Sequence, residues 1–482
     1  MNKKDTPCNS TIEQFSFEEV ERIVAQQGTK DELERQIVAY MNRFFAVVKG
    51  TTATYVEKVI KLRQPPLSTL EVAKPQPIPT IEYVYRTRNG FREALANKSV
   101  VLKSQRVQQT GNRIQTIYQE ETINLYDLWT KSKYRCEYDR LAFTEHDDPR
   151  AFNTFHGLAV QDEDISKYKT KDVQPWLDHI YEIWCKKDDT IFDYVIKRLA
   201  LLVQRPFYKA KVAMVLSGKQ GAGKGSGLAP IQSIFGKYFK ALKPEHVLGQ
   251  FNESLSDCLV LFLDECGFSK TKKGAAQLKT LITEHEHHIN PKHLSGVTVD
   301  NCINLFLASN ERQCAYVEES DRRYLVLEMD NKYAGKSTKE SHAYFSKLGK
   351  VPYQAVYKYL MEMNLKDFVP TIYPMTEATR NQKLYSMDTV TAWVHESLQE
   401  GADWTKASII TRKELYELYD AHVKLHGQQR AKREASGQVF KQLEEVCGAE
   451  RVANSRVSIA LPGAEKMKEA LRTYLNDPEF PI

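Results

Sequence analysis

The chain has 482 residues, a net charge of +6 at pH 7, 42% hydrophobic residues and 27% charged residues. This length predicts about two to four domains, and the composition excludes a low-complexity chain. The eight cysteines form no Cys-x-x-Cys pair, which argues against a zinc ribbon and a disulfide framework. No apolar run reaches about 18 residues, so we expect a cytoplasmic protein that does not enter a membrane. The positive charge permits a nucleic-acid partner without identifying one.

The N-terminal residues 1–170 predict an α+β domain with a basic segment. Residues 11–63 indicate two or three helices and strands, and a proline-rich stretch at 65–79 predicts a linker or edge structure. Residues 86–113 contain seven basic side chains and one acidic side chain, and strand-like runs alternate with them, the last at 123–126. The basic segment favours auxiliary contacts with DNA, and it is equally typical of a solvated surface.

Helical patterns separate this domain from the next one. Helical periodicity begins at Pro175 and resumes over residues 191–203, which predicts a helical collar over residues 171–205. In the following segment, residues 206–350, near-continuous apolar runs end in polar residues. Such runs are typical of parallel strands buried on both faces, so we expect an α/β core.

A glycine-rich segment, residues 216–226, reads Leu-Ser-Gly-Lys-Gln-Gly-Ala-Gly-Lys-Gly-Ser. An apolar run precedes it and helical spacing follows it, as in the strand–loop–helix unit of a phosphate-binding loop. Glycines let the backbone N–H groups turn toward phosphate oxygens, and Lys224 can reach the β- and γ-phosphates. The predicted nucleotide-binding residues are Gly218, Gly221, Ala222, Gly223, Lys224, Gly225 and Ser226.

The loop departs from the common pattern Gly-x-x-x-x-Gly-Lys-Ser/Thr at one position. Gly225 follows the lysine, and the hydroxyl comes one residue later, at Ser226. Because the hydroxyl of the common pattern binds Mg²⁺, Ser226 is the predicted metal ligand of the loop. A glycine-rich turn without a ligand is the alternative interpretation.

A second apolar run, residues 258–265, ends in Asp264 and Glu265. It predicts a buried parallel strand whose carboxyl end faces a ligand. Asp264 is placed to hold Mg²⁺ together with Ser226, and Glu265 to orient and deprotonate the attacking water. An acidic pair with a purely structural role is the alternative.

A β-hairpin is predicted next in the chain. A helical pattern at residues 278–284 is followed by two short strand-like arms around residues 290–296. Lys292 and His293 fall at or near the tip, where they can contact a nucleic-acid backbone. Four histidines lie in this region, but no compact tetrahedral ligand set accompanies them, so we do not expect a zinc site.

A third apolar run, residues 302–310, ends in Ser309 and Asn310. The Asn310 amide can hydrogen-bond the γ-phosphate or the lytic water and so report hydrolysis. Capping of a following helix is the alternative role for this side chain.

Arg322 and Arg323 lie directly before another strand-like run, at residues 324–328. Paired arginines at the start of a strand suit an arginine finger, which stabilises charge on the transferring phosphoryl group. A finger that acts on a neighbouring subunit implies a head-to-tail ring. The sequence does not choose between the two arginines, and two surface ion-pair residues are the alternative.

The C-terminal residues predict a small separate module. Residues 351–400 indicate a helical extension and linker. In residues 401–482, helical patterns at 412–425 and 436–446 precede two short strand-like runs and a last helical pattern at 464–474. This order predicts a winged-helix-like module.

Taken as a set, the motifs of the core resemble those of superfamily 3 helicases, which are AAA+-type ring motors of viruses, phages and plasmids. The nearest likeness is to the helicase part of phage, plasmid and poxvirus-type primase–helicases. The segments that carry the resemblance are Gly221-Ala-Gly-Lys-Gly-Ser-Gly, Phe262-Leu-Asp-Glu, Leu278-Lys-Thr-Leu-Ile-Thr-Glu, Ala308-Ser-Asn, Asp321-Arg-Arg-Tyr and Phe152-Asn-Thr-Phe-His-Gly. The resemblance implies a P-loop AAA+-like three-layer core that uses ATP and Mg²⁺.

The same resemblance implies site roles, partners and assembly. It implies single-stranded or forked DNA as the substrate, a hexamer-like homo-oligomeric ring, and a separate primase or replication partner. Many relatives carry a primase domain with an acidic triad, but residues 1–150 offer only the acidic cluster 145–148, so we assign no priming activity. The implied catalytic residues are Lys224, Asp264, Glu265, Asn310 and Arg322 or Arg323, and the implied DNA contacts are Lys292 and His293.

We therefore expect an ATP-dependent DNA helicase that acts in the replication of a phage, plasmid or related mobile element. An ATP-dependent initiator that assembles on an origin without processive unwinding is one alternative. An AAA+-type remodeller of a protein partner is the other. The hairpin and the winged-helix-like module favour a nucleic-acid substrate over a protein substrate.

Overall fold

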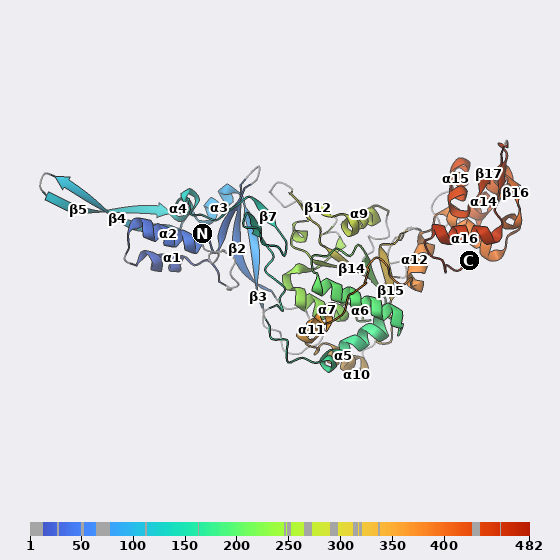
Figure 1. Ribbon diagram of the computed structural model, residues 1–482, viewed down its shortest axis with the longest axis horizontal. Coiled ribbons are helices and arrows are strands. Elements are labelled where there is room, and N and C mark those ends of the chain that lie inside the picture. The colour runs from blue at the N-terminus through green and yellow to red at the C-terminus, as the bar shows by residue number, and fades with distance from the viewer. Residues whose placement is uncertain are drawn as a thin grey trace.

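The computed structural model shows three parts arranged along one axis: an N-terminal α+β part, a central sheet with helices, and a C-terminal helical part (Figure 1). No described helix is long and apolar enough to cross a bilayer. The structure describes residues 13–26, 28–49, 53–63, 78–110, 113–161, 163–244, 247, 252–264, 272–289, 297–311, 317, 321–335, 338–426, 434–453 and 455–482.

The N-terminal part packs helices against a small sheet. Its elements are α1 (Phe17–Val24), α2 (Lys30–Met41), β1 (Phe45–Val48), β2 (Thr54–Arg63), β3 (Ile78–Arg86), α3 (Arg88–Ala94), α4 (Leu125–Lys131), β6 (Glu137–Tyr138), β7 (Arg140–Ala142) and β8 (Ala151–Asn153). Four of the strands form a sheet of order β3-β2-β1-β6. A capping box between Thr29 and Glu32 starts α2. The ring of Phe91 packs edge-on against Phe45 and Trp129, so aromatic contacts fill this core.

A long two-stranded ribbon extends away from the rest of the molecule at the end of this part (Figure 1). β4 (Ser99–Thr110) and β5 (Arg113–Asn124) pair antiparallel along their whole lengths. The strand-like runs of the basic segment therefore belong to one hairpin. The expected strand at 123–126 is wrong beyond Asn124, because the Asn124 side chain accepts a hydrogen bond from the Tyr126 N–H at 2.9 Å and so starts α4.

The predicted collar consists of two α-helices joined by a π-helical turn. Its elements are α5 (Thr170–His179), the π-helix η1 (Ile180–Trp184) and α6 (Asp189–Gln204). The expected helix start at Pro175 is wrong, because α5 begins before the proline. There the Asp172 carboxylate accepts a hydrogen bond from the Lys169 N–H at 2.8 Å and stabilises the first turn.

The centre of the molecule is a five-stranded parallel sheet whose inner strands are mostly buried. Its strands are β9 (Ala213–Ser217), β10 (Phe239–Leu242), β11 (Val260–Leu263), β14 (Asn304–Ser309) and β15 (Tyr324–Glu328). Their order is β10-β11-β14-β9-β15, and every neighbouring pair is parallel. β9 and β14 are buried along their whole lengths, as their near-continuous apolar sequences predict.

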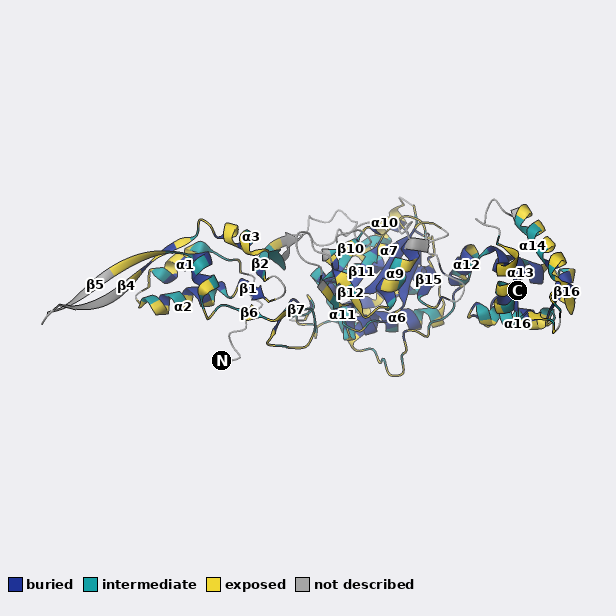
Figure 2. Ribbon diagram, turned by 90° about the horizontal axis from the view of Figure 1, so that it is seen from above, coloured by how far each residue is buried: buried dark blue, intermediate teal, exposed yellow. Residues whose placement is uncertain are grey.

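Helices cover both faces of this sheet. The helical elements around it are α7 (Lys224–Phe235), η2 (Gly236–Tyr238), η3 (Glu253–Leu255), α9 (Lys272–Thr283), α10 (Lys339–Leu348) and α11 (Tyr353–Met361). Met214 and Leu216 of β9 share a core with α6, α7 and α11, whereas Ala213 and Val215 share the opposite core with α9. This alternation produces three layers, and Figure 2 shows the buried residues concentrated in the sheet and the helix faces against it.

The free edge of β15 is covered by a helix. α12 (Glu377–Ser386) packs against this strand, and its first turn carries two threonine hydroxyls. The Thr376 hydroxyl donates to the Val326 carbonyl at 2.6 Å, and the Thr379 hydroxyl accepts from the Val326 N–H at 3.1 Å. These bonds satisfy backbone groups that would otherwise be available to another strand.

The C-terminal part has its own hydrophobic core. Its elements are α13 (Thr389–Glu400), η5 (Asp403–Lys406), β16 (Ile409–Thr411), α14 (Arg412–His426), α15 (Ser436–Cys447), β17 (Glu450–Arg451), β18 (Ser458–Ala460) and α16 (Ala464–Tyr474). The three strands pair in the order β16-β18-β17, and the three helices predicted in this part are confirmed. The core begins at Met387 and includes α13, because Trp393 stacks on Trp404 at 4.6 Å. The expected extension 351–400 is therefore divided between α11 on the central sheet and α13 in the C-terminal core.

Candidate functional site

The glycine-rich loop connects β9 to α7 and adopts backbone conformations that favour glycine. Gly221 has a φ of 77° and Gly223 a φ of 93°. Gly223 is the N-cap of α7. In this geometry the loop and the first turn of the helix present backbone N–H groups to an anion. Glycine is thus the favoured residue at these two positions, and binding of phosphate by the loop stays a prediction.

Lys224, the first residue of α7, lies inside the loop, with 9% of the residue exposed. Its ammonium donates to the Gly218 carbonyl at 2.6 Å and to the Asn310 side-chain oxygen at 2.5 Å. Burial lowers the pKa of Lys224, and the charge of Asp264 opposes this effect. The closest acceptors of the ammonium are thus neutral oxygens, so a phosphate at this position would supply the negative charge that they lack.

Asn310 and Asp264 follow neighbouring strands at the carboxyl end of the sheet. β14 pairs with β11 on one side and with β9 on the other, so the ends of three strands meet here. The Ser309 carbonyl also accepts a hydrogen bond from the Gly218 N–H at 3.1 Å. The structure thus brings Lys224 and Asn310 into contact and places Asp264 at the same edge, as expected from the strand ends. Their catalytic roles stay predictions.

The loop hydroxyl does not take its usual position. Gly225 is exposed, and no atom lies within 4 Å of the point where its Cβ would be. Ser226 is half-buried and lies one residue further along the helix, a rotation of about 100°. The two positions point in different directions, so metal binding by Ser226 stays a prediction.

Within the described ranges, no group of three or more His, Cys, Asp or Glu side chains is arranged to hold a metal ion. Mg²⁺ usually retains several waters and takes one or two protein carboxylates together with substrate phosphates. Asp264 beside the loop fits this mode, in which the metal arrives with the nucleotide.

Three predicted site residues lie outside the described residues: Glu265, Lys292 and His293. The arms of the predicted hairpin are described. β12 (Glu286–Ile289) and β13 (Val297–Asp300) pair antiparallel, which confirms the two arms. The tip lies outside the described residues.

The two candidate arginines differ in their surroundings. The Arg323 guanidinium donates to the Asp321 carboxylate at 2.9 Å, and this carboxylate belongs to a residue that is 2% exposed. Arg322 is exposed and forms no hydrogen bond or ion pair with another described residue. Both precede β15, whereas Lys224 follows β9, so the arginines and the loop lie at opposite ends of two paired parallel strands.

Two side chains that no sequence motif marks also contact the loop. The Asn331 side-chain oxygen accepts a hydrogen bond from the Lys219 N–H at 3.0 Å. The His179 ring nitrogen Nε2 lies 3.1 Å from the Gly223 carbonyl. These partners are far apart in the sequence, so neither contact leaves a local pattern that reading the chain would detect.

The basic segment predicted for auxiliary DNA contacts is partly engaged within the N-terminal part. Arg86 forms an ion pair with Glu57 at 2.6 Å, and Lys103 forms one with Glu120 at 3.0 Å. The Arg88 guanidinium donates to the Tyr126 hydroxyl at 3.0 Å. These contacts favour the surface interpretation for part of the segment.

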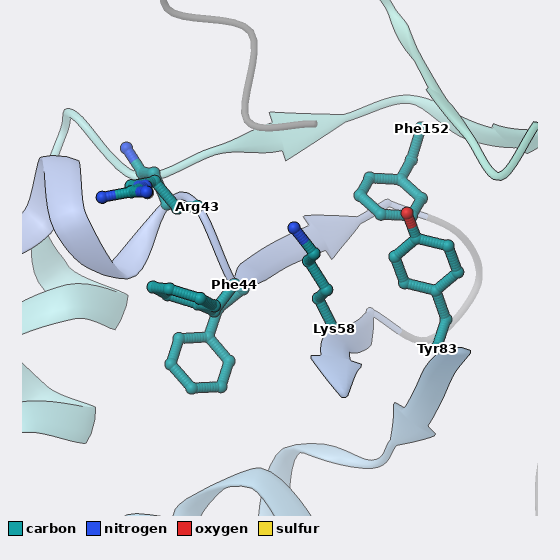
Figure 3. Close-up of a pocket in the computed structure, with 7 residues that line it drawn as sticks. Arg43, Phe44, Lys58, Tyr83 and Phe152 are labelled. Atoms are coloured by element: carbon teal, nitrogen blue, oxygen red, sulfur yellow. The ribbon is translucent and has the colours of Figure 1, made fainter. Parts of the chain in front are cut away.

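A small pocket in the N-terminal part is separate from the loop. Figure 3 shows Lys58, which is 7% exposed, among the rings of Phe44, Tyr83 and Phe152. None of the predicted site residues lines this pocket. The phosphate loop is therefore the candidate functional site. The pocket is lined by Asn42, Arg43, Phe44, Phe45, Lys58, Tyr83 and Phe152.

Comparison with known proteins adds sequence similarity to this geometry. Residues 216–323, from the loop to the paired arginines, match a family of unknown function, DUF5906. Over 151 residues the chain is 32% identical to the DNA primase-polymerase of Nitratiruptor phage NrS-1. This match covers 29% of the chain and 21% of the phage protein, so it spans about a fifth of that relative.

Similarity to solved structures covers more of the chain. The apo structure of the NrS-1 C-terminal region has a TM-score of 0.50, with 75% of this chain and 96% of that chain covered. A second apo structure of the same region, its A form, has a TM-score of 0.52, with coverage of 77% and 98%. Sequence identity is 18% in both comparisons, so the similarity shows a shared mixed α/β fold with a parallel sheet.

Proposed function

We propose that the chain is an ATP-dependent DNA helicase of the superfamily 3 type that acts in the replication of a phage or related mobile element. The position of Lys224 carries the proposal, because its ammonium lies within hydrogen-bond distance of both the loop and Asn310. A lysine so placed at a helix N-terminus suits the β- and γ-phosphates of a nucleotide. The position of β9 between β14 and β15, with layers of helices on both faces of the sheet, supports a P-loop AAA+-like core.

In this proposal, the loop residues and the residues that follow β11 and β14 in the sequence have separate roles in ATP hydrolysis. The loop N–H groups bind the phosphates, and Lys224 exchanges its carbonyl partners for phosphate oxygens. Glu265 takes a proton from the water that attacks the γ-phosphorus, while the bond to the bridging oxygen breaks and ADP leaves. Asn310 orients the water or the γ-phosphate. Ser226 and Asp264 would hold Mg²⁺, which neutralises charge on the phosphate oxygens when it is bound.

We infer that Arg322, as the arginine finger, acts on the site of a neighbouring subunit. Arg322 precedes β15 by two residues, and the register places the far end of β15 beside the start of the loop. Six residues of extended chain span about 20 Å, which is more than an arginine side chain can reach. The proposal therefore includes a head-to-tail ring, in which each Arg322 completes the next site.

Two regions supply the contacts with DNA in this proposal. Lys292 and His293 follow β12 and precede β13 in the sequence, outside the described residues, and in this proposal they contact the backbone of a strand in the central channel. The C-terminal helices with the sheet β16-β18-β17 support a winged-helix-like module. Similarity to part of a phage DNA primase-polymerase supports a role in replication.

Unwinding of a forked DNA duplex with ATP and Mg²⁺ tests the proposal. Lys224→Ala serves as the control, and we expect it to fold normally and to lose ATP turnover by about 100-fold or more. Native mass measurement with forked DNA and an ATP analogue should show a ring. Turnover at the normal rate in Lys224→Ala would contradict the site, and ATP-dependent DNA binding without unwinding would favour the initiator.

A further inference from the structure

The collar contacts the phosphate loop through a fully buried histidine. His179 is the last residue of α5, with 0% of its surface exposed. Its Nε2 lies 3.1 Å from the Gly223 carbonyl, and its Nδ1 lies 2.9 Å from the Tyr344 hydroxyl on α10. One imidazole thus joins the collar, the loop and the helix that follows the sheet.

The hydrogen-bond partners fix the tautomer of this imidazole. A carbonyl oxygen only accepts, so Nε2 carries the proton that it donates to Gly223. The neutral ring then accepts at Nδ1 from the Tyr344 hydroxyl. Tyr344 therefore orients the ring, and the ring orients the carbonyl of Gly223, directly before Lys224.

The close packing of His179 and Phe345 leaves no room for a side chain at position 223. A Cβ at Gly223 would lie 2.6 Å from a carbon of the His179 ring and 3.0 Å from the Phe345 ring. The Gly223 carbonyl also accepts the first hydrogen bond of α7, from the Gly227 N–H at 3.1 Å. His179 thus packs against the N-cap of the helix whose first residues present N–H groups to phosphate.

Tyr344, which contacts His179, is also connected to the start of the loop through Tyr333 and the nearby Asn331. Tyr344 stacks on Tyr333 with their ring centroids 4.0 Å apart. Tyr333 lies two residues after Asn331, which accepts the hydrogen bond from the Lys219 N–H. The loop is therefore held at its start through Asn331 and at its end through His179.

We propose that His179 is a positioning residue, which holds the phosphate loop in its binding conformation and connects the loop to the collar. The inference rests on the proposed function, since it assumes that the loop binds ATP. It assigns His179 a role that no nucleotide-binding motif contains. Tyr344 acts through His179 by fixing the tautomer.

Binding of ATP and its hydrolysis, measured separately in the full chain, test this role. Tyr344→Phe removes one oxygen and keeps the ring that stacks on Tyr333, and His179→Phe removes both hydrogen bonds. We expect the Kd and KM for ATP to rise by about threefold in Tyr344→Phe and about tenfold in His179→Phe, while kcat at saturating ATP stays within about twofold. His179→Gln, whose amide can donate to Gly223, should recover part of the affinity.

Tyr194→Phe is the matched control. It removes the hydrogen bond of a buried tyrosine hydroxyl, donated to the Pro370 carbonyl at 2.6 Å, in the same hydrophobic core. This variant should leave the Kd for ATP unchanged. Normal ATP affinity in folded Tyr344→Phe and His179→Phe, or equal losses in Tyr194→Phe, would overturn the inference. Absence of ATP binding by the unmodified chain would instead overturn the proposed function.

Discussion

The two ends of the central sheet differ in one partner of their positive charges, because the amino end contains an arginine bound to a buried carboxylate. At the carboxyl end, the hydrogen-bond acceptors of the Lys224 ammonium are neutral oxygens of the loop and of Asn310. At the amino end, Arg323 is fixed to the buried Asp321 carboxylate, and Arg198 is fully buried against the side chain of Asn304 at 2.6 Å. In the proposed function, the Lys224 ammonium at the carboxyl end exchanges these contacts for a phosphate, whereas the contacts of the two arginines at the amino end stay as they are.

In the proposed function, one subunit alone lacks an arginine from the pair Arg322 and Arg323 that can reach its own loop. The exposed guanidinium at the amino end is Arg322, too far from its own loop to act there. A neighbour that stacks its loop against this end would use it. Thr376 and Thr379 bind the backbone groups of Val326 on the edge strand β15, which hinders strand pairing at this point, so the proposed ring would form through side-chain contacts.

The largest expected effect comes from Arg322→Ala. If Arg322 stabilises charge on the γ-phosphoryl group in a neighbouring site, kcat should fall by about 1,000-fold while the Kd for ATP stays nearly constant. Single-turnover hydrolysis and equilibrium binding separate the two quantities. Mixing Arg322→Ala with Lys224→Ala should restore some activity, because certain interfaces then combine an intact loop with an intact arginine.

Arg323→Ala is the control that separates the two arginines. Its loss leaves the buried Asp321 carboxylate without a guanidinium partner, so we expect a lower Tm rather than a loss of kcat of this size. A larger kcat defect in Arg323→Ala than in Arg322→Ala would reverse the assignment. Failure to recover activity at any mixing ratio would argue against a site shared between subunits.

A second effect concerns pH and the carboxyl end of the sheet. Burial lowers the pKa of His179 from 6.5 to about 4. Because the folded chain binds this proton less readily than the unfolded chain, the stabilisation is fully present above about pH 6.5 and is lost as the pH falls toward about 4. The loss amounts to about 3 kcal/mol. Unfolding measured between pH 7 and pH 4 should show it.

The control for the pH effect is His179→Gln, in which the side chain at position 179 no longer titrates in this range. Burial also lowers the pKa of His287 to about 4, so part of the acid sensitivity belongs to the hairpin and persists in the variant. The difference between the two profiles isolates His179. If stability fell equally with pH in the unmodified chain and in His179→Gln, protonation of the His179 imidazole would not contribute to the pH dependence of folding.

The local patterns of the sequence predict much of this molecule. The loop, the strands that end in Asp264 and Asn310, and the C-terminal helices are all recognisable, because each depends on residues within a few turns or one strand. The contact between Asp321 and Arg323 is an example of a feature that local sequence patterns do not predict. The burial of Asp321 and its contact with Arg323 distinguish two adjacent arginines, and that information comes only from the packing of the folded chain.

The same reason explains the errors at element boundaries and the missed contacts. Pro175 suggests a helix start, yet α5 already begins at Thr170. His179 looks like an ordinary residue of an amphipathic helix, and its contact with Gly223 joins positions 44 residues apart. Contacts between distant segments leave no periodicity, so sequence reasoning identifies the loop and misses the residues that support it.

A smaller effect tests which side chain takes the hydroxyl role in the loop. We expect Ser226→Ala to raise the Mg²⁺ concentration for half-maximal ATPase activity by about tenfold, because one metal ligand is lost. The space around Gly225 accepts a side chain. Adding Gly225→Ser to Ser226→Ala should therefore recover part of the Mg²⁺ affinity, since it places a hydroxyl at the common position. An unchanged Mg²⁺ dependence in Ser226→Ala would exclude Ser226 as a ligand.

The smallest effect should be the change in stability caused by Arg198→Met, at the amino end of the sheet. Burial lowers the pKa of Arg198 to about 10, so the guanidinium remains charged, and its Nε has no hydrogen-bond partner among the described residues. Methionine fills most of the volume without a buried charge, and Asn304 keeps its contact with the Ala210 N–H at 3.4 Å. We expect a loss of about 1 kcal/mol, or about 2–4 °C in Tm, with ATP turnover unchanged. A tenfold fall in turnover would mean that the amino end takes part in hydrolysis within its own subunit, and the contrast between the two ends would fail.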